Sequence, residues 1–216
     1  MTRIAAGTWR VRLLAFSLLL SGSAFGGGRH EPKAAVGVYV IYEHLSSGRA
    51  LLQSDVQSIL LPLGFSIQWR DMKTAGREAW VDLALLRFQG HCDLFRASGI
   101  AFVPGALGET HVSDGRIQPF AEIDCDRIGN LLQPDLAAVR EPDRERLFQR
   151  ALARVVAHEL YHIFAKTPVH EPTGVGKAEF TASDLLSNRF QFHPAQASVL
   201  LKSSSDDALQ ISLNQP

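Results

Sequence analysis

A long helical pattern in the second half of the chain constrains the fold more than any other feature. Pro142 and Asp143 stand where the first turn of a helix favours them, and Thr167-Pro168 follows where a helix should stop. Between these signals, apolar residues recur at helical spacing at Leu147, Leu152, Val155, Val156, Leu160 and Ile163. The sequence therefore predicts a helix from residue 143 to about residue 165 or 166, with a buried apolar face.

Two histidines and a glutamate lie in the middle of this predicted helix. His158 and His162 are four residues apart, so both imidazoles project from one face of the helix, one turn apart. Two such rings can bind one Zn²⁺ ion at about 2.0 to 2.1 Å each, and Glu159 can reach a water on that ion. His-Glu-x-x-His is the arrangement of zinc peptidases, whereas a chance pattern would be two surface histidines beside an ordinary glutamate.

A catalytic zinc ion usually has three protein ligands and one open position, so a third ligand is expected. His170 follows the predicted helix end closely, and a returning loop would bring it to the metal. Imidazole is the commonest protein ligand of metals, which places His170 first. The competing candidates are carboxylates, in the order Asp184, Glu179 and Glu171.

The rest of the chain predicts a sheet with several helices. Apolar and alternating runs predict strands at 35–42, 65–69 and 79–88, and a helix occupies 48–61 between the first two. An Asp114-Gly115 turn predicts a hairpin with arms 109–112 and 117–123, and Pro119 favours an edge position for the second arm. A short turn of helix is expected at 135–138. A short helix is expected at 181–188, capped by Thr181 or Ser183.

The two ends of the chain lie outside the predicted domain. Residues 1–26 combine early arginines, a short apolar run and small residues, which is typical of a signal peptide; the alternative is an uncleaved membrane anchor. Residues 27–33 then form a flexible leader, the domain covers 34–203, and 204–216 form a polar, frayed tail. We expect a secreted or periplasmic bacterial protein that has no stable membrane insertion after cleavage.

Composition and cysteine content narrow the functional classes. Cationic and anionic residues balance at 22 each, so the chain has no basic excess for binding nucleic acid. The 46% apolar content of the 216 residues suffices for one domain with a real core. Cys92 and Cys125 are the two cysteines, and in an exported protein they predict a disulfide rather than two free thiols.

The segment from His158 to His162, together with His170, resembles the zincin superfamily of metallopeptidases, and within it the metzincins. It is also similar to uncharacterised secreted bacterial proteins that share these histidines and a segment like 174–177. The chain departs from the metzincin pattern His-Glu-x-x-His-x-x-Gly-x-x-His, since Ala165 and Pro168 hold the glycine and last histidine places. No methionine follows the motif.

This resemblance implies an α+β fold in which a mixed β-sheet packs on the active-site helix, followed by a short C-terminal helical part. It also implies an edge strand that holds an extended peptide substrate. The arm around Gly108, Thr110 and His111 is the candidate for that strand. His111 either faces the cleft or is an ordinary exposed edge residue.

The resulting hypothesis is an exported zinc-dependent metallopeptidase with a peptide or protein substrate. A metal-activated water would attack the peptide bond, with Glu159 as general base. The alternative hypothesis is a catalytically inactive zincin-fold binding or scaffold protein with a structural zinc, for which a closed fourth ligand would be evidence. Substrate specificity, oligomeric state and the choice between endo- and exopeptidase stay open.

Overall fold

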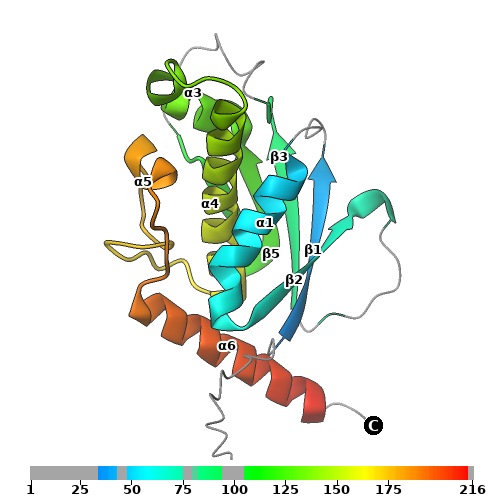
Figure 1. Ribbon diagram of the computed structural model, residues 1–216. Coiled ribbons are helices and arrows are strands. Elements are labelled where there is room, and N and C mark those ends of the chain that lie inside the picture. Colours follow the sequence, from blue (N-terminus) through cyan, green and yellow to red (C-terminus); the bar gives the residue numbers. More distant parts are fainter. Residues whose placement is uncertain (1–33, 43–47, 75–79, 81, 94–104, 214–216) are drawn as a thin grey trace, which may run out of the picture.

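The computed structural model describes residues 34–42, 48–74, 80, 82–93 and 105–213 (Figure 1). The predicted signal peptide and leader fall outside the described residues, so their boundaries stay predictions. Among the helices of the described part, none has the length and apolar character needed to cross a membrane.

Within the described residues, five strands form one mixed sheet in the order β2-β1-β3-β5-β4 (Figure 1). The first four of these neighbours run parallel to one another, and the edge strand β4 runs antiparallel to β5. The strands are β1 (Ala34–Tyr42), β2 (Phe65–Asp71), β3 (Asp82–Gln89), β4 (Gly108–Ser113) and β5 (Arg116–Asp124). The predicted mixed sheet and its hairpin around Asp114-Gly115 are confirmed.

Helices α1 and α4 lie side by side over one face of this sheet (Figure 1). Helix α3 lies at one end of α4, and α6 crosses near its other end. The helices are α1 (Arg49–Leu60), α3 (Cys125–Leu136), α4 (Asp143–Ala165), α5 (Ala182–Leu186) and α6 (Pro194–Leu213), with short 3-10 turns at Leu61–Leu63 and Met72–Thr74. The fold is therefore α+β, with the sheet packed on the helix that carries the motif, as expected.

The core forms where alternate strand side chains meet α1 and α4. Successive side chains of a strand point to opposite faces, so one apolar set from each of β1, β2, β3 and β5 faces the helices. These buried residues are Val36, Val38, Val40, Phe65, Ile67, Ala84, Leu86, Phe88, Ala121 and Ile123. Helix α4 is buried from Ala151 to Ala165, which explains why its sequence is apolar around most of its circumference.

Three sequence expectations differ from the structure. Helix α3 occupies most of a region for which only a short helical turn at 135–138 was expected, because Asp124 caps it by accepting from Arg127 N. Helix α6 continues to Leu213, so most of the expected frayed tail is helical. The third expectation is an edge position for β5, but β5 is an interior strand that pairs with both β3 and β4. Its pairing with β3 begins at Phe120, after Pro119. Pro119 therefore needs no partner on that side.

A disulfide joins Cys92, which follows β3, to Cys125 at the start of α3. Both residues are buried, and their sequence separation is 33. The predicted pairing is confirmed. It ties the ends of two neighbouring parallel strands together on the side where α3 begins.

We predict that the double variant Cys92→Ala/Cys125→Ala is less stable than the parent by about 3 to 4 kcal/mol. Cross-linking a loop of this length removes about that much conformational entropy from the unfolded chain. Urea unfolding of both proteins measures the difference. Equal midpoints in the two proteins would contradict the expectation.

Candidate metal centre

The local geometry at the end of α4 brings the motif and His170 together. His158, Glu159 and His162 are 7%, 3% and 5% exposed, in the buried half of α4. The helix ends at Ala165, and the left-handed backbone of the capping residue Lys166 turns the chain back on itself. The returning segment then carries His170 beside the two helix histidines.

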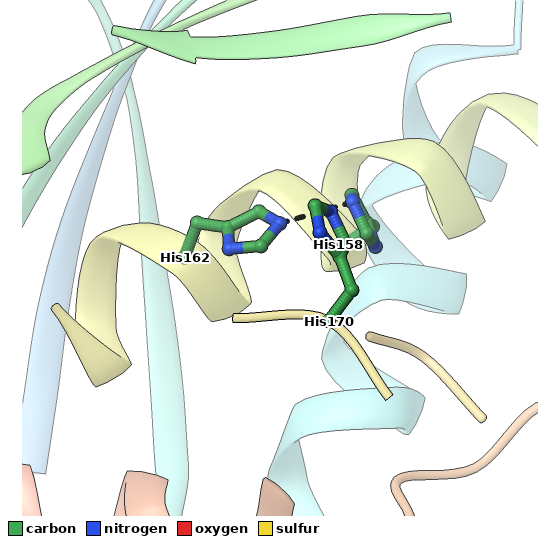
Figure 2. Close-up of side chains that lie close together, drawn as sticks. All are labelled: His158, His162 and His170. Carbon is green, nitrogen blue, oxygen red and sulfur yellow. Dashed lines mark hydrogen bonds between the residues drawn. The ribbon is translucent and has the colours of Figure 1, made fainter. Parts of the chain in front are cut away.

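The three imidazoles converge on one point, as Figure 2 shows. The His158 and His162 Nε2 atoms are 3.1 Å apart. The His170 ring stacks on that of His158 and meets that of His162 edge-on, with ring centroids 5.3 and 4.7 Å apart. One nitrogen from each ring lies within 4.8 Å of the other two. The structure thus brings together the three residues predicted as metal ligands.

Backbone carbonyls determine which ring nitrogens carry hydrogen. His158 Nδ1 lies 2.8 Å from the Val175 oxygen, and His162 Nδ1 lies 2.7 Å from the Thr167 oxygen. A carbonyl oxygen only accepts hydrogen bonds, so each Nδ1 must be the donor. In the neutral rings both Nε2 atoms then carry lone pairs, and these face each other across the 3.1 Å separation.

The surroundings keep these two rings neutral. Burial, and secondly the proximity of His162, lower the pKa of His158 to about 3. Burial also lowers the pKa of His162, against the opposing effect of its bond to Thr167. Two neutral acceptors facing each other repel unless a positive species lies between them. The arrangement could therefore hold a cation, because metal ligation requires deprotonated imidazole.

Glu159 lies on the same stretch of α4 and contacts the edge strand. The Thr110 hydroxyl donates to Glu159 Oε2 over 2.7 Å. Burial raises the pKa of Glu159 to about 7, although the Thr110 hydrogen bond acts in the opposite direction. A carboxylate with a pKa near neutrality is suited to accept and release protons at physiological pH.

The residues from Glu171 to Lys177 form a loop that supports His158, and no sequence signal had pointed to this role. The carbonyl of Val175 in this loop accepts from His158. Gln196 of α6 is fully buried and donates to Thr173 O over 3.2 Å, so α6 anchors the loop. Gly176 packs tightly between Gln196 and Tyr161. Only the fold brings these segments next to His158 of the candidate metal site.

The carboxylates considered as alternative ligands are not in the histidine cluster. Asp184 Oδ2 accepts from Lys177 Nζ and from the Thr181 backbone and hydroxyl, and these bonds outweigh its burial and lower its pKa. It therefore belongs to the predicted Thr181 cap of α5. Glu179 is exposed at the cleft, and Glu171 pairs through its backbone with Lys177.

A cleft of about 670 Å³ opens in front of the three histidines. Gly108 and Thr110 of β4 line it, and its other walls include Leu107, Ile117, Leu131, Val155, Pro168 and Phe180. His111 is not part of the lining; its ring packs on Phe120, and its Nε2 lies 3.6 Å from Glu122. Of the two readings of His111, the structure supports the exposed edge residue.

We predict that Glu159→Gln stabilises the metal-free protein at pH 8 by about 1 to 3 kcal/mol. The folded protein holds a proton on Glu159 up to about pH 7, whereas the usual pKa is 4.5. The parent therefore loses stability as pH rises between these values, and the glutamine variant lacks that loss. Urea unfolding at pH 4.5 and pH 8 measures it, with exposed Glu179→Gln as control. A gain that is equal at both pH values would contradict the prediction.

We predict that Gly176→Ala destabilises the protein by about 1 to 3 kcal/mol through overpacking. An added Cβ would lie 2.6 Å from Gln196 Nε2 and 2.9 Å from Tyr161 Cε1. Urea unfolding measures the loss. In the double variant with Gln196→Ala, the combined loss should be smaller than the sum of the single losses, because the obstructing amide is gone. Strict additivity would rule out this contact as the cause.

Comparisons with known proteins show a likeness in fold and none in sequence family. No protein-family model matches the chain, and no curated protein matches it. The fold is similar to the crystal structure of archaemetzincin from Methanopyrus kandleri, with a TM-score of 0.49 and 11% sequence identity, over 82% of this chain and 98% of that one. A likeness at this level assigns neither a family nor an activity, so the function has to be inferred from the geometry of the site.

Proposed function

We propose that this protein is a zinc-dependent peptidase that hydrolyses peptide bonds in its cleft. The observation that carries the proposal is the pair of facing Nε2 lone pairs of His158 and His162, 3.1 Å apart, with His170 beside them. Two nitrogens that share one zinc ion at about 2.0 to 2.1 Å lie about 3.3 Å apart at near-tetrahedral angles. The observed separation is close to that value.

The donor set fits zinc in a catalytic rather than a structural role. Three neutral imidazoles are a known ligand set of catalytic zinc, which keeps a fourth position for water or substrate. Among the described residues, the cluster contains no fourth ligand atom from a cysteine or carboxylate. His170 is exposed and lines the cleft, so a substrate can approach the site from that side. These features favour a peptidase over an inactive scaffold with a closed site.

The chain's own residues would perform the proton transfers. A zinc ion held by His158, His162 and His170 would supply Lewis-acid chemistry, which polarises a carbonyl and lowers the pKa of a water to about 7. Glu159 would accept the proton of the attacking water on its free oxygen and return it to the leaving amine. The Val175 and Thr167 carbonyls would hold the two helix imidazoles in their ligating tautomer.

Other parts of the proposal concern substrate and location. The edge strand β4 lines the cleft through Gly108 and Thr110, so an extended peptide would bind beside it, as expected for a strand-adding substrate.

Export is supported by the N-terminal sequence pattern and by the disulfide, since disulfides persist in oxidising compartments. The proposed location is secreted or periplasmic.

We predict that the purified protein binds one zinc ion per chain and that His158→Ala and His162→Ala lose it. Each replacement removes one of two ligands held by backbone hydrogen bonds, so the affinity should fall at least about 100-fold. Metal analysis and chelator competition measure it. The control His193→Ala, an exposed histidine outside the cluster, should keep the metal. Full zinc occupancy in His158→Ala would show that the ion is bound elsewhere.

We predict that Glu159→Gln keeps zinc but loses hydrolysis of unfolded protein substrates by about 10²-fold to 10⁴-fold. The amide cannot accept the proton, while the three imidazoles are untouched. Cleavage is followed by the release of new amino termini. A zinc-loaded parent that cleaves nothing across a broad peptide panel would support the scaffold alternative, and a variant as active as the parent would exclude Glu159 as the base.

A further inference from the structure

The edge strand β4 crosses α4 at the position of Glu159, where a hydroxyl group of the strand meets the carboxylate of the helix. Thr110 Oγ1 lies 2.7 Å from Glu159 Oε2 and 3.3 Å from the backbone oxygen of the same residue. We propose that Thr110 is a positioning residue, whose hydroxyl holds the Glu159 carboxylate in its working orientation. This inference rests on the proposed function, because it gives Glu159 the role of general base.

The absence of a side chain at Gly108 makes room for the other oxygen of the Glu159 carboxylate. A Cβ atom built on Gly108 would lie 2.6 Å from Glu159 Oε1 and 2.9 Å from Val155 Cγ1. The space that a side chain would fill is therefore occupied by the second carboxylate oxygen. Residues two apart on a strand face the same side, so Gly108 and Thr110 act together on one carboxylate. Thr110 binds one oxygen, and Gly108 leaves room for the other.

The physical reason for such a device lies in the freedom of a glutamate side chain. Rotation about its last bond is broad and roughly two-fold, so a carboxylate without a partner presents either oxygen in many orientations. Glu159 is also almost fully buried, where a polar atom without a hydrogen bond is costly. Because Oε2 accepts a hydrogen bond from Thr110, Oε1 is the oxygen that remains to take the proton from the water and to return it to the leaving amine.

Thr110 is assigned a positioning role rather than a catalytic one because its hydroxyl is used on Glu159. Its hydroxyl also lies within reach of the α4 backbone, which would by itself give it a merely structural role. The two roles differ in what they predict. A structural contact affects stability, whereas a positioning contact affects turnover while substrate affinity and zinc affinity stay the same.

The test compares Thr110→Val, Thr110→Ser and Ser113→Val. Valine has nearly the shape of threonine and keeps the strand preference but lacks the hydroxyl, and serine restores the hydroxyl. Ser113 is an exposed hydroxyl on the same strand, outside the cleft lining. We expect Thr110→Val to lower kcat about 10-fold to 100-fold, because misplaced catalytic groups cost about that much. KM and zinc affinity should stay within about three-fold, and Thr110→Ser should recover most of kcat.

A ligand-binding measurement gives a second readout that needs no turnover. Acetohydroxamate can bind the zinc-loaded protein and also hydrogen-bond to the Glu159 carboxylate, whereas azide needs only the metal. We expect Thr110→Val to weaken acetohydroxamate binding about 10-fold and to leave azide binding unchanged, since one oriented charge-assisted hydrogen bond is affected. If the valine variant does not fold, Thr110→Ala removes the same hydroxyl and is measured in its place.

The outcomes separate this proposal from the proposed function. If the zinc-loaded parent hydrolyses no peptide, the proposed function fails, and the acetohydroxamate comparison still decides the role of Thr110. If the parent is active and Thr110→Val keeps the parental kcat, the positioning role is overturned. It is also overturned if Ser113→Val loses as much activity as Thr110→Val, or if acetohydroxamate and azide weaken equally.

Discussion

The site depends on two hydrogen bonds from imidazoles to backbone carbonyls. His158 donates to Val175 O and His162 donates to Thr167 O, so each ring is left with an unprotonated Nε2. These two atoms lie 3.1 Å apart in a buried setting, where repulsion between lone pairs is weakly screened. The rest of the site follows from holding two acceptors together in this way, since a cation between them relieves the conflict.

Much of the surrounding structure serves to keep those carbonyls in place. Thr167 follows directly from the turn that ends α4, so the His162 contact is local. The Val175 contact is not local, because the loop that supplies it is anchored by Gln196 of α6 and packs on Tyr161 through Gly176. The C-terminal helix therefore supports the candidate metal site from a distance in sequence. This is the kind of outer support on which metal sites commonly depend.

The same burial that suits the site to chemistry is unfavourable for the metal-free fold. The pKa of Glu159 is raised to about 7 and that of His158 is lowered to about 3, both chiefly by burial. At neutral pH the Glu159 carboxyl is therefore held away from its usual ionised state, whereas a histidine with the usual pKa of 6.5 is mostly neutral there in any case. Local conflicts of this kind are expected at functional sites and are offset by favourable packing elsewhere. Here the offsetting part is the apolar core between the sheet and the two helices α1 and α4.

Sequence alone determined the elements whose signals are local. The span of α4, the hairpin turn at Asp114-Gly115, the strand pattern of β1 and the cap of α5 by Thr181 all follow from periodicity or from side chains a few residues apart. Spacing alone also placed His158 and His162 on one helix face. These interactions need no information about distant parts of the chain, which is why short patterns suffice.

Tertiary structure decided everything that depends on contacts between distant segments. His170, rather than Asp184, meets the helix histidines because the left-handed turn at Lys166 returns the chain and because Lys177 and Thr181 already engage Asp184. The role of Val175, the contact of Thr110 with Glu159 and the interior position of β5 likewise depend on how the strands and helices pack. Residue spacing does not indicate such packing, because the sequence around a carbonyl or a hydroxyl is the same whichever distant segment that group contacts.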